Sequence, residues 1–75
     1  MKYRFIDGFE FEAGSPEEIC TAIWKSMKFS FHASLQEWIE ASAAVIREGL
    51  GEHLRTDSPE HHVEDMLATG VLKKI

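Results

Sequence analysis

The chain has 75 residues, which suffices for one domain (1–75) and not for two, because typical domains run to roughly 100–150 residues. Hydrophobic residues make up 44% and charged residues 28% of the chain, values that argue against a disordered tail and against a membrane protein. Eight Lys and Arg stand against thirteen Asp and Glu, and the net charge of −5 disfavours direct binding to nucleic acid.

The first predicted element is a β-hairpin with strands at residues 2–6 and 9–13. Asp7-Gly8 between them is a favoured two-residue hairpin turn, because both residue types tolerate a positive φ. Aromatic and polar side chains alternate along both strands, which places the aromatic ones on one face. These aromatic residues are Tyr3, Phe5, Phe9 and Phe11. We expect helices to pack on this face.

A helix is predicted from Pro16 to about Lys28. Ser15 supplies the capping hydroxyl, Pro16 suits the first helical position, and Glu18 completes a capping box. Apolar residues recur at helical spacing on one side: Ile19, Cys20, Ile23, Trp24 and Met27. Residues 29–32 are predicted to be a connector or a short extended segment, and the sequence leaves open whether Trp24, Phe29 and Phe31 belong to the core or to an interface.

A second helix is predicted over residues 35–48. Ser34 and Glu37 form another capping box, and Gly49 with Gly51 ends the helix. Its apolar seam has the three-and-four spacing of a buried helix face. The seam contains Leu35, Trp38, Ile39, Ser42, Val45, Ile46 and Gly49. Trp38 is therefore predicted to be a core residue.

A third helix is predicted to begin at Pro59, after the cap Ser58, and to end at Gly70. Residues 53–56 before it are a candidate third strand, so that a strand followed by a capped helix occurs twice. Residues 71–75 form an apolar, basic-tipped tail and are a further candidate strand that returns to the sheet. The predicted fold class is α+β, with a small antiparallel sheet packed against two or three helices.

Catalytic and metal chemistry have little support in the sequence. His61 and Glu64 lie one helical turn apart, as do His62 and Asp65, but a stable metal site needs three or four ligands. We therefore predict neither an enzyme nor a cofactor, and leave open whether the two histidines bind a metal. The single cysteine, Cys20, has apolar neighbours and is predicted to be a buried thiol in a reducing cytoplasm.

Two acidic stretches, at residues 7–18 and 57–65, contain no Lys or Arg. If the predicted strand-helix units pack side by side, carboxylates from both stretches form one continuous face. This face is predicted to bind a basic partner, and a purely solubilising surface is the alternative. Its residues are Glu10, Glu12, Glu17, Glu60, Glu64 and Asp65.

The extended start, the capped helix, the Ala-rich second helix and the ending from Arg55 to Ile75 resemble small acidic proteins of mobile genetic elements. These proteins are carried by phages and conjugative elements and include anti-CRISPR inhibitors and antiactivators. The resemblance implies a non-enzymatic protein that blocks a nucleic-acid-handling complex or a transcriptional activator by occupying its surface, and the acidic face predicts that this surface is basic. A structural module that assembles with itself, for example as a homodimer, is the alternative, and a small enzyme or metal protein is a third.

Overall fold

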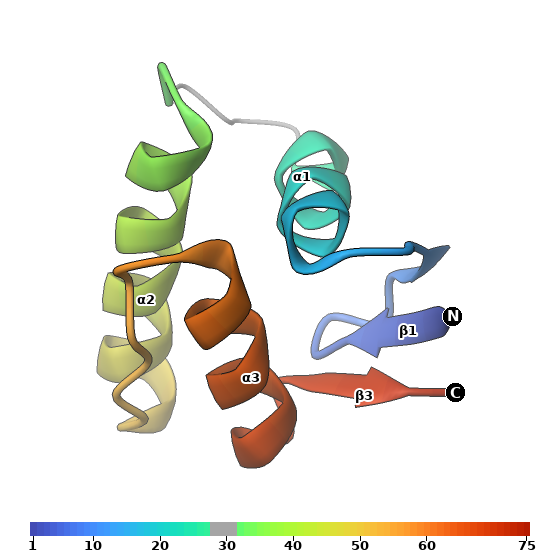
Figure 1. Ribbon diagram of the computed structural model, residues 1–75. Coiled ribbons are helices and arrows are strands. Elements are labelled where there is room, and N and C mark those ends of the chain that lie inside the picture. Colours follow the sequence, from blue (N-terminus) through green and yellow to red (C-terminus); the bar gives the residue numbers. More distant parts are fainter. Residues whose placement is uncertain (28–31) are drawn as a thin grey trace.

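The computed structural model describes residues 1–27 and 32–75 (Figure 1). In chain order the elements are β1 (Lys2–Phe5), β2 (Glu10–Glu12), α1 (Pro16–Ser26), α2 (Leu35–Leu50), α3 (Pro59–Thr69) and β3 (Leu72–Lys74). The strands form one antiparallel sheet that packs against the helices. The predicted α+β class is confirmed. Of the predicted connector at residues 29–32, only His32 belongs to the described residues. The predicted helix end at Lys28 lies outside them.

Strand β1 is the centre of the sheet, whose strand order is β2-β1-β3. Tyr3 lies opposite Phe11 on one side and opposite Lys74 on the other, and both pairings are antiparallel. The third strand is therefore Leu72–Lys74, which lies within the candidate strand predicted at residues 71–75. Figure 1 shows β1 and β3 side by side with both chain ends at the same edge of the molecule.

The prediction of a strand at residues 53–56 is wrong. These residues form no strand and connect α2 to α3. Side chains of α3 bind the backbone here in place of a neighbouring strand. The Asp65 carboxylate accepts a hydrogen bond from the Arg55 N–H at 2.7 Å, and the His62 ring lies 3.1 Å from the Arg55 carbonyl oxygen. The predicted strand-helix repeat is therefore absent.

The hairpin loop has three residues, Ile6, Asp7 and Gly8, and the predicted two-residue turn is wrong. The Gly8 N–H donates to the Phe5 carbonyl at 2.9 Å, and Gly8 alone among the loop residues has a positive φ, of 94°. The additional residue aligns Tyr3 with Phe11, and their rings stack at 5.8 Å between centroids. A two-residue turn places Arg4 opposite Phe11, so the predicted aromatic face depends on the longer loop.

All three helices begin at the serine that the sequence predicts. Ser15, Ser34 and Ser58 each accept a hydrogen bond at 3.2 Å from the N–H three residues later. The Glu18 and Glu37 carboxylates accept from the N–H of the residue before each cap, at 3.0 and 3.3 Å. Helix α1 ends at Ser26, and α2 continues through Gly49 to a left-handed cap at Gly51 with a φ of 73°.

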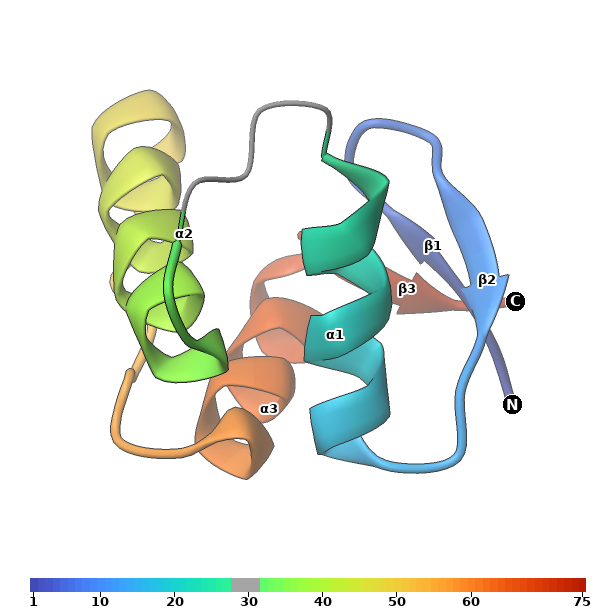
Figure 2. The ribbon, with the colours of Figure 1, turned by 90° about the horizontal axis from the view of Figure 1, so that it is seen from above.

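The core lies where α1 and α3 pack between α2 and the sheet (Figure 2). Trp38 is 1% exposed, which confirms it as a core residue. The other large and fully buried side chains come from all three helices and from β3 and the residue before it. They are Ile23, Ile39, Met66, His62, Val71, Leu72 and Cys20. None of the helices in the described part of the chain has the length and apolar character that a membrane span requires.

Candidate functional site

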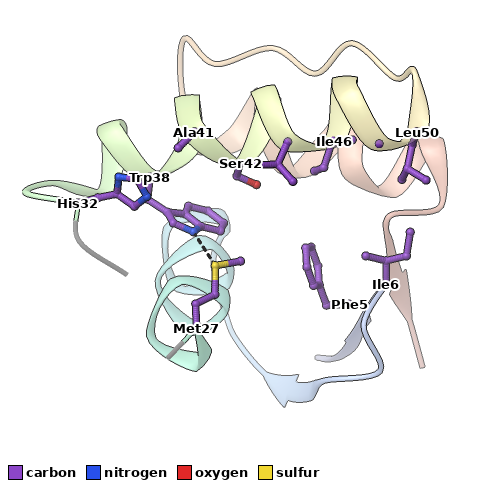
Figure 3. Close-up of a pocket in the computed structure, with 11 residues that line it drawn as sticks. Phe5, Ile6, Met27, His32, Trp38, Ala41, Ser42, Ile46 and Leu50 are labelled. Carbon is purple, nitrogen blue, oxygen red and sulfur yellow. Dashed lines mark hydrogen bonds between the residues drawn. The ribbon is translucent and has the colours of Figure 1, made fainter. Parts of the chain in front are cut away.

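An apolar groove of about 410 Å³ opens on one side of the molecule, between α2 and the hairpin (Figure 3). Figure 3 shows the side chains of Phe5 and Ile6 facing those of α2 across the groove. Met27, just after α1, and His32, just before α2, close one end. The α2 wall includes Ala41, Val45 and Leu50. Nearly all of the lining surface is carbon, so the groove suits an apolar ligand.

Exposed hydrophobic side chains gather at this groove. Six large hydrophobic residues are exposed in the described part of the chain, and four of them line the groove. Their exposed fractions are 69% for Val45, 54% for Ile6, 51% for Leu50 and 38% for Met27. A contiguous exposed apolar patch on a small protein typically marks an interaction site. The prediction that Val45 lies in the buried seam is therefore wrong.

Trp38 forms part of the groove wall and is also fixed in the core. Its indole N–H donates to the Met27 sulfur at 3.3 Å, a bond that joins α2 to the end of α1 (Figure 3). The His62 ring stands edge-on to the indole, with ring centroids 6.0 Å apart. Contacts from both sides hold the Trp38 ring in one orientation, so this part of the groove is preformed.

His62 is fully buried against Trp38. Its Nδ1 atom lies 3.1 Å from the Arg55 carbonyl oxygen, and since a carbonyl only accepts, Nδ1 carries the proton. Its Nε2 atom is buried with no partner among the described residues. Burial lowers the pKa of His62 and keeps the ring neutral. The sequence signal for the burial of His62 is that it lies four residues, about one helical turn, before the apolar Met66.

The two neighbouring histidines lie in different environments. His61 is partly exposed, and its Nδ1 atom lies 2.8 Å from the Asp57 carboxylate, which lowers the pKa of Asp57. Glu64 pairs instead with Arg55 at 3.4 Å. Within residues 1–27 and 32–75, no group of three or more His, Cys, Asp or Glu side chains has the arrangement of a metal site.

The six predicted partner-binding carboxylates occupy three places, namely the start of α1, the side chain of Arg4 and the side chain of Arg55. Glu12 and Glu17 line a hollow beside Ser15, and Glu60 and Glu64 line a second hollow that includes the same serine. These four residues therefore gather around the start of α1. Glu10 forms an ion pair with Arg4 at 2.9 Å.

Asp65 is the carboxylate most engaged within the chain. It accepts hydrogen bonds from both the backbone and the guanidinium of Arg55, with an ion-pair distance of 2.9 Å. These bonds lower the pKa of Asp65. Arg55 also pairs with Glu64, so one arginine binds two of the six predicted residues. Of the six predicted residues, Glu12, Glu17 and Glu60 thus contribute most to the acidic surface around the start of α1, together with Glu18 of the same first turn. Lys25 and Lys74 line the same two hollows.

Cys20 is the predicted buried thiol. Its exposed fraction is 0%, and burial raises its pKa to about 12. A thiol in this state is neither a nucleophile nor a metal ligand at neutral pH. Among the described lining residues of the groove, His32 is the one His, Cys, Asp, Glu, Lys or Arg side chain, so the groove offers apolar contact rather than paired acid-base groups.

No protein-family model, curated protein or solved structure matches this chain. The function is therefore inferred from the chemistry of the groove and of the surrounding charge. The groove was not predicted from the sequence, although two residues of the groove carry a signal there. Ile6 falls outside the aromatic alternation of the hairpin, and Leu50 lies between two glycines after the predicted end of the seam.

Proposed function

We propose that this protein is a non-enzymatic binding protein that docks on another protein through the apolar groove. The observation that carries the proposal is the gathering of four exposed hydrophobic side chains around one preformed groove. The centre of a protein interface is typically apolar and depleted of charge, whereas its rim is polar. The carbon-lined groove has the composition of such a centre.

The narrower proposal is that the partner is a nucleic-acid-binding protein or complex with a basic surface, and that docking inhibits it. The net charge of −5 and the carboxylates around the start of α1 support attraction to such a surface. The resemblance to anti-CRISPR inhibitors and antiactivators supports inhibition as the outcome. A cytoplasmic location is part of this proposal, and the buried Cys20 thiol is compatible with it.

Copurification followed by an activity measurement tests the proposal. The tagged protein and its Val45→Glu variant are each recovered from the cells that make the protein, and the proteins bound to each are compared. We expect a nucleic-acid-binding partner with the wild type and its loss with the variant. Titration of purified wild type should then lower the nucleic-acid binding or cleavage by that partner. A partner whose activity is unchanged in the complex would overturn inhibition.

Self-assembly is the second candidate function, because the same four exposed side chains suit a contact between two copies of the chain. In that case the wild type forms a dimer whose mass in sedimentation equilibrium depends on concentration. The Val45→Glu variant then stays monomeric. A wild type that is monomeric at high concentration excludes this candidate.

A further inference from the structure

The lining of the groove limits the conformation of its occupant. Its polar side chains among the described residues are Trp38, Ser42 and His32, and the Trp38 N–H is already bonded to Met27. An extended peptide in the groove would leave its backbone N–H and C=O groups without partners. A helix satisfies these groups internally and presents only side chains. The groove therefore favours a helix over an extended segment.

The length of the groove fits a short helix. Helix α2 lines it from Trp38 to Leu50, which is about 18 Å at 1.5 Å per residue. This span corresponds to about three turns of a second helix lying along α2. Apolar side chains spaced three and four residues apart on the second helix would reach Val45, Leu50 and the opposite wall at Ile6.

The charged side chains that flank the groove in the described part of the chain are acidic. On α2, Glu37 lies one turn before Ala41, Glu48 lies one turn after Val45, and both glutamates are exposed. Asp7 is exposed beside Ile6 in the hairpin loop. Arg47 instead lines a separate hollow on the other side of α2. A second copy of this chain would bring the same acidic border and the same net charge of −5 to the contact, which opposes its binding.

We propose that the groove binds a basic amphipathic helix of a partner protein. The apolar side of that helix lies between α2 and the hairpin, and its lysines or arginines lie against Glu37, Glu48 and Asp7. The inference rests on the proposed function as a binding protein and specifies the part of the partner that the groove recognises. Apolar contact supplies the affinity, and the acidic border selects the charge of the helix.

Three synthetic peptides of about 14 residues, or four helical turns, test the proposal. The first has leucines on one helix face and lysines on the other, the second has glutamates in place of the lysines, and the third has the first composition with its leucines spread over all faces. Each peptide is titrated into the wild type by calorimetry. We expect the first peptide to bind at least about tenfold more tightly than the other two.

Matched variants locate the binding to the groove. Val45→Glu and Ile75→Glu each add one negative charge at an exposed hydrophobic residue, but Ile75 lies outside the groove. We expect Val45→Glu to weaken the first peptide by about tenfold or more and Ile75→Glu to change it less than about twofold. Glu48→Lys should weaken the basic peptide and strengthen the acidic one. Val45→Ser is the replacement if circular dichroism shows that Val45→Glu is unfolded.

Several results would overturn the proposal. Equal binding of all three peptides, or equal binding to the wild type and Val45→Glu, removes the groove as the site. Equal binding of the first and second peptides, with weaker binding of the third, removes the selection for a basic helix, and a wild-type dimer that excludes the peptide favours a second copy. If the peptides fail while a partner still copurifies, the helix proposal is wrong and the proposed function stands. Peptide binding without any copurifying partner contradicts the proposed function alone.

Discussion

His62 links the stability of the protein to pH. Its ring is fully buried, and burial lowers its pKa below the ordinary value of 6.5. The unfolded chain therefore binds this proton at a higher pH than the folded protein does. The stability that neutral His62 contributes is fully present above about pH 6.5 and is lost as the pH falls towards the folded pKa.

We predict that the free energy of unfolding of the wild type decreases as the pH falls below about 6.5. The His62→Gln variant is expected to be less stable at pH 7 but to lose less stability over the same pH range, because its side chain does not titrate. Urea midpoints at a series of pH values measure both slopes. Bonds to His61 and Arg55 lower the pKa of Asp57 and Asp65, so these carboxylates act in a separate, more acidic range. Parallel slopes for the two proteins would contradict this assignment.

Trp38 illustrates what residue spacing predicts and what it does not. Its position between Leu35 and Ile39 in an apolar seam identifies it as buried, and it is buried. The spacing does not reveal that one edge of the ring contacts Met27 and lines a groove, because Met27 lies on another helix end. Val45 shows the converse, since it has the spacing of the seam but faces the groove.

At the scale of single elements, the helix starts are the features that depend most on individual side chains. Ser15→Ala and Ser34→Ala each remove the acceptor of one N–H bond at a helix N-terminus. We predict a loss of about 1 kcal/mol for each variant, which is large against the few kcal/mol of a domain this small. Chemical denaturation of the two variants measures the loss.

Aspartate is the matched control for the cap prediction, because its carboxylate accepts the same bond. Ser15→Asp and Ser34→Asp should retain the free energy of unfolding of the wild type to within a few tenths of a kcal/mol. If alanine and aspartate variants have equal midpoints, the hydroxyl is not the stabilising group at that helix start.

The helices were largely predictable from the sequence and the sheet was only partly so, for a physical reason. A cap such as Ser34 and an apolar stripe act within a few residues, so they are visible in a short stretch. A strand outside a hairpin needs a partner that is distant in the chain. Residues 53–56 have a strand-like sequence but bind side chains of α3, whereas Leu72–Lys74 finds β1. The groove could not be predicted for the same reason: its walls come from elements that are separate in the chain.

For the molecule as a whole, the carboxylates around the start of α1 should accelerate encounter with a basic partner. We predict that replacement of Glu12, Glu17 and Glu60 by lysine lowers the association rate and its dependence on salt, with a smaller effect on dissociation. Surface plasmon resonance with the copurified partner measures both rates. Glu17 and Glu60 lie in first helical turns, so their reversal should also cost about 0.3–1 kcal/mol each.

A second triple variant separates a local surface from net charge. Glu10, Glu40 and Glu52 do not line the hollows at the start of α1, and their replacement by lysine changes the net charge by the same amount. If both triple variants slow association equally, the carboxylates at α1 have no special role and only net charge matters. If neither does, the acidic surface serves solubility alone.

The position of β1 between β2 and β3 determines when the sheet is completed during synthesis. The hairpin of β1 and β2 leaves the ribosome early, but the other neighbour of β1 is made after all three helices. Until then one edge of β1 has unpaired N–H and C=O groups beside the aromatic Tyr3 and Phe5, and such an edge can pair with other chains. The nascent protein therefore finishes folding only when residues 72–74 are free of the ribosome. Any fusion that delays their release prolongs the exposure of this edge.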